Sequence, residues 1–433
     1  MTQTPLAPPS GSRDFLPDNM RHRLALLARI RDVFERHGFA PMETPAFERL
    51  EVLAGKYGAE GDKLIFKILK RGEKAASGEA DMALRYDLTV PAVRFYAHRR
   101  NELPRIFKRY QMGPVWRADR PGHGRFREFL QCDVDIFGSA SPLADIECLL
   151  ALAAALTEVG LPDFTIRLNS RRVLHAMMTA YGVAEADHGG ALVALDKLDK
   201  ISIDGVRAEL SERGIAAEAL CEDIARDNFD DLLRNKLDNE AGRDGLAEID
   251  SIRDGVAAGL PAGTIRFDPL LARGLDYYTG AIYEFISDGI GSSIAGGGRY
   301  DDLAGMFLKD SVPICGGSLG IERILMLVEE RMAAPTPTLA YVTVWDADSA
   351  ADSLALAARL RKAGLAAETD LTGAKLGRQF RTADDRGCRF ALVRGPEECE
   401  ADLVTVKDLN SGDQQQVALD AVASHLRSAL CHS

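Results

Sequence analysis

The residues from Arg117 to Phe137 combine positive charge with a row of polar side chains that could recognise a small ligand. Four arginines lie in the segment from 117 to 127. Beyond them, apolar residues alternate with Gln131, Asp133 and Asp135, and this period of two predicts a β-strand with the three polar side chains on one face. Because three polar groups are costly to bury without partners, we expect the strand to bind a small ligand beside arginines that hold a polyphosphate or a nucleic acid.

The chemistry of this segment favours phosphate. The planar guanidinium of Arg117 or Arg125 can donate two parallel hydrogen bonds and stays charged, and Phe129 could stack on a base or another ring. The alternative is a surface hairpin with solvated arginines, which would be the better explanation for one arginine alone but not for the whole arrangement.

A second group of candidates lies upstream, in the segment from Arg85 to Pro91. Asp87 and Thr89 alternate and therefore point the same way, so they could hold an ammonium group. A helix N-cap at either position is the competing interpretation.

Two further segments offer a fixed cation, phenol groups and close backbone approach. Arg273 precedes Tyr277 and Tyr278, whose hydroxyl groups both donate and accept, although these rings could also be ordinary core aromatics. The glycines at 296–298 allow the backbone to approach a ligand, or they form a flexible loop. No βαβ pattern surrounds them, which argues against a dinucleotide site.

Cations also occur near two predicted helices. Small residues from Gly316 lead into a helix whose first turn contains Arg323, a position suited to the end of a phosphate tail. The alternative is a tight strand–helix turn in which Glu322 and Arg323 are solvated. The cations at 375–386 have helical spacing and could bind RNA, or they form a solvated face.

Length and composition limit the class of protein. The chain has 433 residues, 46% of them hydrophobic and 27% charged, which predicts a soluble protein with two or three domains. A net charge of −12 argues against a protein that coats nucleic acid non-specifically, but not against a local basic surface that docks one folded RNA. No apolar run is long enough to span a membrane.

The cysteines indicate a reducing compartment. Seven cysteines are scattered singly without a Cys-x-x-Cys pair, which argues against structural zinc and against a disulfide framework. The N-terminus shows no secretion signal. We therefore expect a cytoplasmic protein.

The periodicity predicts the elements that must position these residues. Helical spacing covers 20–37, 143–159 and 170–181, and strand-like runs lie at 64–69, 83–86, 106–117, 126–137, 164–168, 265–268, 281–286 and 314–319. Strands linked by hairpins, with helices set apart, predict an antiparallel α+β domain. Residues 188–258 have only helical character and predict an insertion.

The C-terminal part differs in pattern. Residues 333–338 predict a short, stiff linker. Strands and helices alternate after it and predict a small α/β domain, with strands at 339–345, 366–369, 389–394 and 402–407 and helices at 349–363, 375–386 and 416–430.

Taken together, these segments resemble the class II aminoacyl-tRNA synthetases, and most closely the histidyl-tRNA synthetase family. Gly38 and Pro45 look like motif 1, Arg117 to Asp133 like motif 2 and Gly316 to Arg323 like motif 3. Residues 272–280 and 295–301 are similar to segments specific to the histidine enzymes. The resemblance runs from about Gly11 to about Val417, with the signatures in the family order.

The resemblance implies a fold and a reaction. It implies a class II antiparallel-sheet catalytic domain over 1–187 and 259–332, a helical insertion over 188–258 and an α/β anticodon-binding domain over 339–433. It implies activation of L-histidine by ATP with Mg²⁺ to histidyl-adenylate and pyrophosphate, followed by transfer of the histidyl group to the 3′ end of tRNA(His). It also implies a homodimer that pairs through motif 1.

The resemblance implies roles for individual residues as well. Arg117 and Arg273 would act on either side of the α-phosphate as catalytic residues. The implied histidine-binding residues are Asp87, Thr89, Arg117, Gln131, Asp135, Tyr277 and Tyr278. The implied ATP-binding residues are Arg117, Asp119, Arg125, Phe129, Arg273 and Arg323, and no protein side chain is predicted to be a metal ligand.

Some positions depart from the usual family pattern. Asp stands at 87, 119 and 135, where many members have Glu, and Ser318 and Asp302 replace glycines. The loop 120–124 lacks a glutamine that bacterial relatives often have, so recognition of the tRNA acceptor end stays open.

Three other functions compete with this interpretation. A histidine sensor that activates an enzyme of histidine biosynthesis would typically lack the C-terminal domain and the catalytic arginines. Another class II synthetase would lack the signatures at 272–280 and 295–301. A non-enzymatic RNA-binding module would not need a polar pocket of imidazole size.

Overall fold

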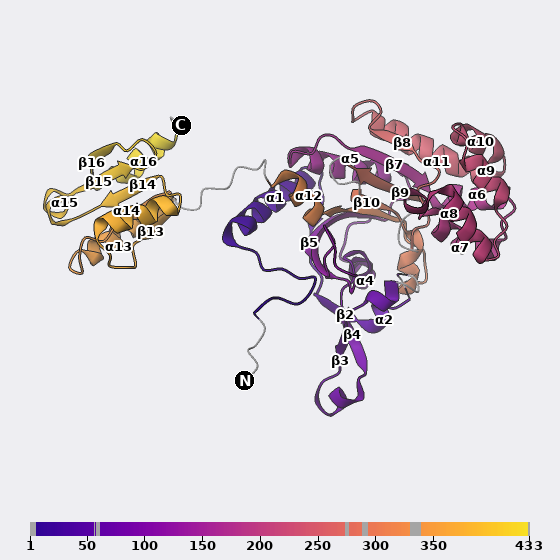
Figure 1. Ribbon diagram of the computed structural model, residues 1–433, viewed down its shortest axis with the longest axis horizontal. Helices are drawn as coiled ribbons and strands as arrows, with labels where there is room; N and C mark the ends of the chain where they lie inside the picture. The colour runs from indigo at the N-terminus through magenta and orange to yellow at the C-terminus, as the bar shows by residue number, and fades with distance from the viewer. Residues whose placement is uncertain are drawn as a thin grey trace. The chain divides into compact units, whose positions relative to one another are not determined.

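The computed structural model describes residues 6–55, 57, 61–272, 277–287, 293–329 and 339–431, and the chain divides into two compact units, Met1–Met332 and Ala333–Ser433 (Figure 1). The linker predicted at 333–338 lies outside the described residues, and the boundary between the units falls at its start.

The first unit is built on one large sheet. Within the described residues, eight strands follow the order β1-β5-β6-β11-β10-β9-β7-β8. Their bounds are β1 Ala40–Pro41, β5 Phe107–Trp116, β6 Glu128–Phe137, β7 Thr165–Ser170, β8 Ile265–Phe267, β9 Ala281–Ile286, β10 Ser293–Arg299 and β11 Ile314–Gly320. The central pairs are antiparallel, as expected, while β1 with β5 and β7 with β8 are parallel, so the sheet is mixed.

The glycine segment at 295–301 was open to a loop interpretation, and the structure places most of it in β10. The strand pairs with β9 on one side and β11 on the other, with Gly297 opposite Tyr283 and Gly317. A side chain at Gly297 would collide with the backbone of β11. Only glycine therefore lets β10 and β11 pair this closely at this position.

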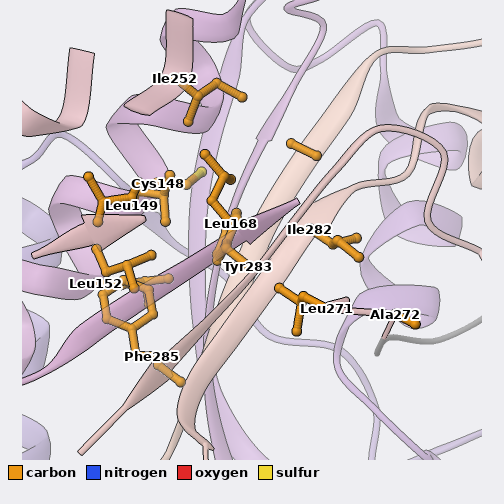
Figure 2. Packing of buried hydrophobic residues seen from close by; sticks show 14 of the residues in the cluster. Cys148, Leu149, Leu152, Leu168, Ile252, Leu271, Ala272, Ile282, Tyr283 and Phe285 are labelled. Atoms are coloured by element: carbon orange, nitrogen blue, oxygen red, sulfur yellow. The ribbon is translucent and has the colours of Figure 1, made fainter. Parts of the chain in front are cut away.

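One face of the sheet is covered by a hydrophobic core. The helix α5 (Pro142–Glu158) is apolar nearly all round, which is typical of a buried helix, and its Cys148, Leu149 and Leu152 are fully buried. They belong to the same cluster as Leu168 of β7 and Tyr283 of β9 (Figure 2). The helices α1 (Pro17–Arg36) and α12 (Ile321–Val328) add to this cluster through Ile30 and Ile324.

A second, smaller hydrophobic cluster lies within the same unit. It joins α2 (Leu50–Leu53) and α4 (Thr89–Arg99) to residues of β5, β6 and β11. A small sheet stands beside it, with the order β2-β4-β3 and the bounds β2 Phe47–Arg49, β3 Lys67–Leu69 and β4 Ala80–Leu84.

The predicted insertion consists of helices joined by turns, without a strand, over 188–258. Figure 1 shows these helices together with α6 (Arg171–Ala180) at one side of the unit, near β7 to β9. Their bounds are α7 His188–Leu195, α8 Leu198–Glu212, α9 Glu218–Ile224, α10 Phe229–Lys236 and α11 Glu240–Ala257.

The second unit is an α/β fold, as predicted. Its sheet has the order β13-β12-β14-β15-β16, with β12 Ala340–Val342, β13 Ala367–Thr369, β14 Phe390–Val393, β15 Leu403–Asp408 and β16 Gln414–Ala418. Its helices are α13 Ala350–Lys362, α14 Leu376–Asp385, α15 Pro396–Ala401 and α16 Val422–Cys431. The prediction of one helix over 416–430 was wrong at its start, because Gln414–Ala418 pairs with β15 and the helix begins at Val422.

Candidate active site

The polar face predicted for β6 forms the floor of a cavity. β6 lies between β5 and β11, so Asp135 is paired with Arg109 on one side and with Gly316 on the other. Asp133 is paired with Ser318 on β11. Glycines and a serine on β11 leave open the space above the carboxylates that larger side chains would fill.

This cavity is small and polar. Its volume is about 150 Å³, which suits one small ligand. It is lined by Asp87, Thr89, Arg117, Gln131, Asp133, Asp135, Tyr277, Tyr278, Gly296, Tyr300, Gly316, Gly317 and Ser318. All seven residues that the resemblance implied for histidine binding therefore lie around one cavity, although they come from segments as far apart in the chain as Asp87 and Tyr278.

Asp135 is held at the cavity floor by two groups that sequence reasoning did not identify. The fully buried Arg109 forms an ion pair with its Oδ2, and the hydroxyl of Tyr300 donates to its Oδ1. Burial raises the pKa of Asp135, and the charge of Arg109 opposes this shift. Burial and Asp135 raise the pKa of Tyr300, so its hydroxyl keeps the proton that it donates.

Asp87 lies at the other side of the cavity and serves two purposes at once. Its Oδ1 accepts from the backbone N–H of Val90 at 3.0 Å and from the hydroxyl of Tyr57 at 3.2 Å. Its Oδ2 accepts from the hydroxyl of Tyr277 at 3.4 Å. The N-cap of α4 is Leu88, so the interpretation of Asp87 or Thr89 as the N-cap residue was wrong, although Asp87 binds an N–H of the first turn and also lines the cavity.

Gln131 leaves one hydrogen-bonding atom free for a ligand. Its Nε2 donates to Oγ of Ser318 at 3.0 Å, while its buried Oε1 has no hydrogen-bond partner among the described residues. Since a buried acceptor without a partner is costly, this oxygen is suited to a donor on a bound molecule.

A second, larger cavity adjoins the first. Its volume is about 630 Å³, and it shares Arg117, Gln131, Gly296 and Ser318 with the small cavity. The rest of its lining consists of Asp119, Gly124, Arg125, Phe126, Phe129, Leu130, Asp196, Lys200, Ser293, Ile294, Ala295, Gly320, Glu322 and Arg323. A ligand in the small cavity can therefore meet one in the large cavity at Arg117.

Arg117 is fixed at this junction. Its Nε donates to the carbonyl oxygen of Tyr86 at 3.0 Å, and its guanidinium lies 4.3 Å from the ring centre of Tyr86 and 5.2 Å from that of Phe129. A cation held between two rings keeps its position and its remaining donors. Those donors are available to an anion that joins the two cavities.

Two other arginines of the large cavity are oriented by their neighbours. Arg125 pairs with Asp119 at 2.7 Å, and Nη1 of Arg323 donates to the carbonyl oxygen of Ser293 at 2.5 Å. Together with Arg117 they give a cavity with an aromatic side chain, Phe129, and several guanidinium groups. This arrangement can hold a ring with a polyphosphate tail.

The solvated interpretation of Glu322 was wrong. Glu322 is buried and pairs with Arg23 of α1 through two hydrogen bonds of 2.6 and 3.0 Å, and it also pairs with Arg13. Its Oε1 accepts from the backbone N–H of Leu130 at 3.2 Å. Burial raises the pKa of Glu322, but its arginine partners outweigh this and hold it below its usual value. Glu322 therefore ties α1 and α12 to β6.

Several residues of the site could not be placed or found from the sequence. Arg273 lies outside the described residues. The sequence pattern did not indicate three further lining or contacting residues, Tyr57, Arg109 and Lys200. Each is a single polar side chain in a segment with no motif around it. Tyr300 could have been found, since it lies within the segment 295–301 that the sequence analysis had already selected.

No helix among the described residues is long and apolar enough to cross a membrane. Within the same residues, no group of three or more acidic, histidine or cysteine side chains is placed to hold a metal ion.

Comparisons with known families match both units. A family model described as histidyl-tRNA synthetase matches residues 11–324, and one described as anticodon binding domain matches residues 341–429.

Individual relatives agree with these family matches. The chain is 38% identical to a histidine–tRNA ligase of Cytophaga hutchinsonii over 96% of this chain and 98% of that protein. It is 44% identical to one of Leifsonia xyli over 75% of this chain and 81% of the relative. A solved histidyl-tRNA synthetase from Nostoc sp. has a TM-score of 0.81 and 32% identity over 99% of this chain and 100% of that structure.

Proposed function

The chain belongs to the histidyl-tRNA synthetase family and is a histidine–tRNA ligase, and from this we propose how its two cavities divide the reaction. The small cavity binds L-histidine and the large one binds ATP. The carboxylate of histidine attacks the α-phosphate, which gives histidyl-adenylate and releases pyrophosphate. The histidyl group then passes to the 3′-terminal adenosine of tRNA(His).

The observation that carries this proposal is the junction at Arg117. The two cavities share this cation, so the reacting carboxylate and the α-phosphate would meet beside one guanidinium. Adenylyl transfer needs alignment and positive charge where negative charge develops, rather than covalent help from the protein. Arg273 is proposed on the other side of the α-phosphate from the family resemblance alone.

The amino acid is selected on the floor of the small cavity. Asp135 and Tyr278 hydrogen-bond the imidazole with Tyr277 beside them, while Asp87, Thr89 and Gln131 hold the amino and carboxylate groups. The ion pair with Arg109 and the hydrogen bond from Tyr300 fix the orientation of the Asp135 carboxylate. A pocket whose polar groups are left unpaired by other amino acids can discriminate by about 10⁴–10⁵.

The nucleotide is held in the large cavity. Phe129 stacks on adenine, Arg125 steadies the bent triphosphate, and Arg323 binds its γ-phosphate end. Asp119 orients Arg125 through their ion pair. Mg²⁺ supplies charge neutralisation to the triphosphate when bound. Of the three acidic side chains that line the cavity, Asp119 and Glu322 are paired with arginines, so the phosphate oxygens would be its main ligands.

The domain roles and the assembly complete the proposal. Residues 1–187 and 259–332 form the catalytic domain, 188–258 an insertion that contacts tRNA, and 339–433 the anticodon-binding domain. The protein is a cytoplasmic homodimer that pairs through α1 and the segment after it. Met20 and Leu24 on α1 are exposed apolar side chains, which supports an interface there.

The test is ATP–pyrophosphate exchange by the purified protein with each of the twenty amino acids. Exchange with histidine alone, followed by charging of tRNA(His) transcripts, is the expected result. Arg117→Ala should abolish exchange while calorimetry still detects histidine binding. Exchange with another amino acid, or none with histidine, would contradict the proposal, and light scattering at micromolar concentration tests the dimer.

A further inference from the structure

The three carboxylates of the small cavity differ in how well the protein itself satisfies them. Asp87 accepts from a backbone N–H and two tyrosine hydroxyls, and Asp135 is bound by Tyr300 and Arg109. Asp133 lies between them and is equally buried, yet its hydrogen bonds come from neutral groups alone, Nε2 of Gln131 at 3.5 Å and the hydroxyl of Ser318. It forms no ion pair with any described residue. Asp133 is therefore the carboxylate that most needs a partner from outside the protein.

The charged groups around Asp133 do not supply that partner. Arg109 favours its charged form, but the ion pair of this guanidinium is with Asp135. Arg85 is also buried nearby, and its N–H groups donate to the carbonyl oxygens of Pro114 and Thr44.

The remaining neighbours give no net positive charge. Asp135 and Asp87 oppose ionisation of Asp133, while the neutral hydroxyl of Ser318 favours the charged form through a hydrogen bond but brings no charge. Burial is the largest effect and raises the pKa of Asp133 to about 7. Near pH 7 this carboxyl group therefore exchanges between its neutral and its charged form. A bound cation would favour the charged form.

The position of Asp133 along β6 indicates which part of the ligand it meets. Asp135 lies deep in the cavity beside Tyr300 and Gly316, whereas Gln131 and Ser318 also line the large cavity. An amino acid that sends its carboxylate towards Arg117 and its side chain towards Asp135 must place its α-carbon between the two. Asp133 faces this middle section of the cavity floor.

Resting on the proposed binding of histidine in this cavity, we propose that Asp133 is a specificity-determining residue that pairs with the α-ammonium group of the amino acid, opposite Asp87. The carboxylates of Asp87 and Asp133 then lie on opposite sides of the ammonium group. A ligand without the ammonium group leaves Asp133 buried and unpaired, so the cavity rejects imidazole compounds that are not amino acids.

The test compares two ligands that differ only in the ammonium group. Histidine and 3-(imidazol-4-yl)propionate are measured by calorimetry, or as competitors in exchange, against the wild type and Asp133→Asn. The substitution keeps the shape and removes the charge. It should lower the affinity for histidine by about 10–100-fold and change the affinity for the propionate by less than twofold.

The matched contrast is Asp135→Asn, which should weaken both ligands because Asp135 faces the imidazole. If Asp133→Asn weakens both ligands equally, or neither, the proposed pairing is wrong. A wild-type protein that does not bind histidine would instead refute the proposed function. Asp133→Ser serves as a second variant if the asparagine variant does not fold, with the same expected pattern.

A pH profile gives a readout that a purely structural role would not move. Below about pH 7 the incoming ammonium group must displace the proton that Asp133 holds, so the wild type should lose affinity for histidine as the pH falls. From pH 8 to pH 6 this loss should be about tenfold greater in the wild type than in Asp133→Asn. Equal profiles would overturn the proposal.

Discussion

A methyl group added at Gly316 should close the small cavity to histidine. Gly316 lies on β11 directly opposite Asp135, and an added Cβ would stand 2.6 Å from the carboxyl carbon of Asp135. Favourable contact between carbon atoms begins at about 3.5 Å, so the overlap is close to 1 Å. The backbone cannot yield easily, because β11 is hydrogen-bonded between β6 and β10.

The size of the effect follows from this overlap. Overpacking of a closely packed site typically costs about 1–3 kcal/mol. The added Cβ would also collide with the backbone oxygen of Val134, so relief requires β6 to shift together with the Asp135 carboxylate, which disturbs the floor that the imidazole contacts. Gly316→Ala should therefore lower the affinity for histidine by about 5–150-fold, since each 1.4 kcal/mol of binding free energy is a factor of ten in affinity.

Calorimetry with histidine is the assay, and Gly305→Ala is the matched control. An added Cβ at Gly305 meets no atom within 4 Å, so this variant should bind histidine like the wild type. Circular dichroism and thermal unfolding distinguish lost binding from lost folding. A folded Gly316→Ala protein with unchanged affinity would show that the ligand does not occupy the space above Asp135.

Three further changes test other parts of the site. Arg323→Ala should raise the KM for ATP by about 10–100-fold with little change in histidine affinity, because it removes one charge-assisted phosphate contact; pyrophosphate exchange at varied ATP measures both. Arg109→Met should lower the free energy of unfolding in urea by about 3–5 kcal/mol, since it leaves the Asp135 charge buried without its partner, and an unchanged urea midpoint would count against that pair. The raised pKa of Asp133 means that the folded, ligand-free protein keeps a proton that the unfolded chain has released, so stability falls between about pH 4 and pH 7. Asp133→Asn should accordingly be more stable than the wild type at pH 8 by about 1–4 kcal/mol. Urea unfolding at pH 5 and pH 8 measures this difference. The same pH dependence in the variant and the wild type would contradict the assigned role of Asp133.

The sequence was sufficient for features that depend on local geometry. Residues two apart on a strand share a face whatever surrounds them, so the common orientation of Gln131 and Asp135 followed from periodicity. The helical insertion and the C-terminal α/β pattern followed in the same way. The order of the motifs gave the family, which the comparisons confirm.

Tertiary structure decided which groups partner these side chains. Arg109 meets Asp135 only because β5 and β6 pair in one register, and Tyr300 reaches the same carboxylate from a position 165 residues away. Glu322 looked like a solvated residue at a helix start, but it is buried because Arg23 packs against it from α1. The sequence by itself determined which chemistry the chain can offer, whereas the assembled sheet determined which carboxylates are neutralised and which one is left for the ligand, because charge pairing depends on distance in space and not on distance along the chain.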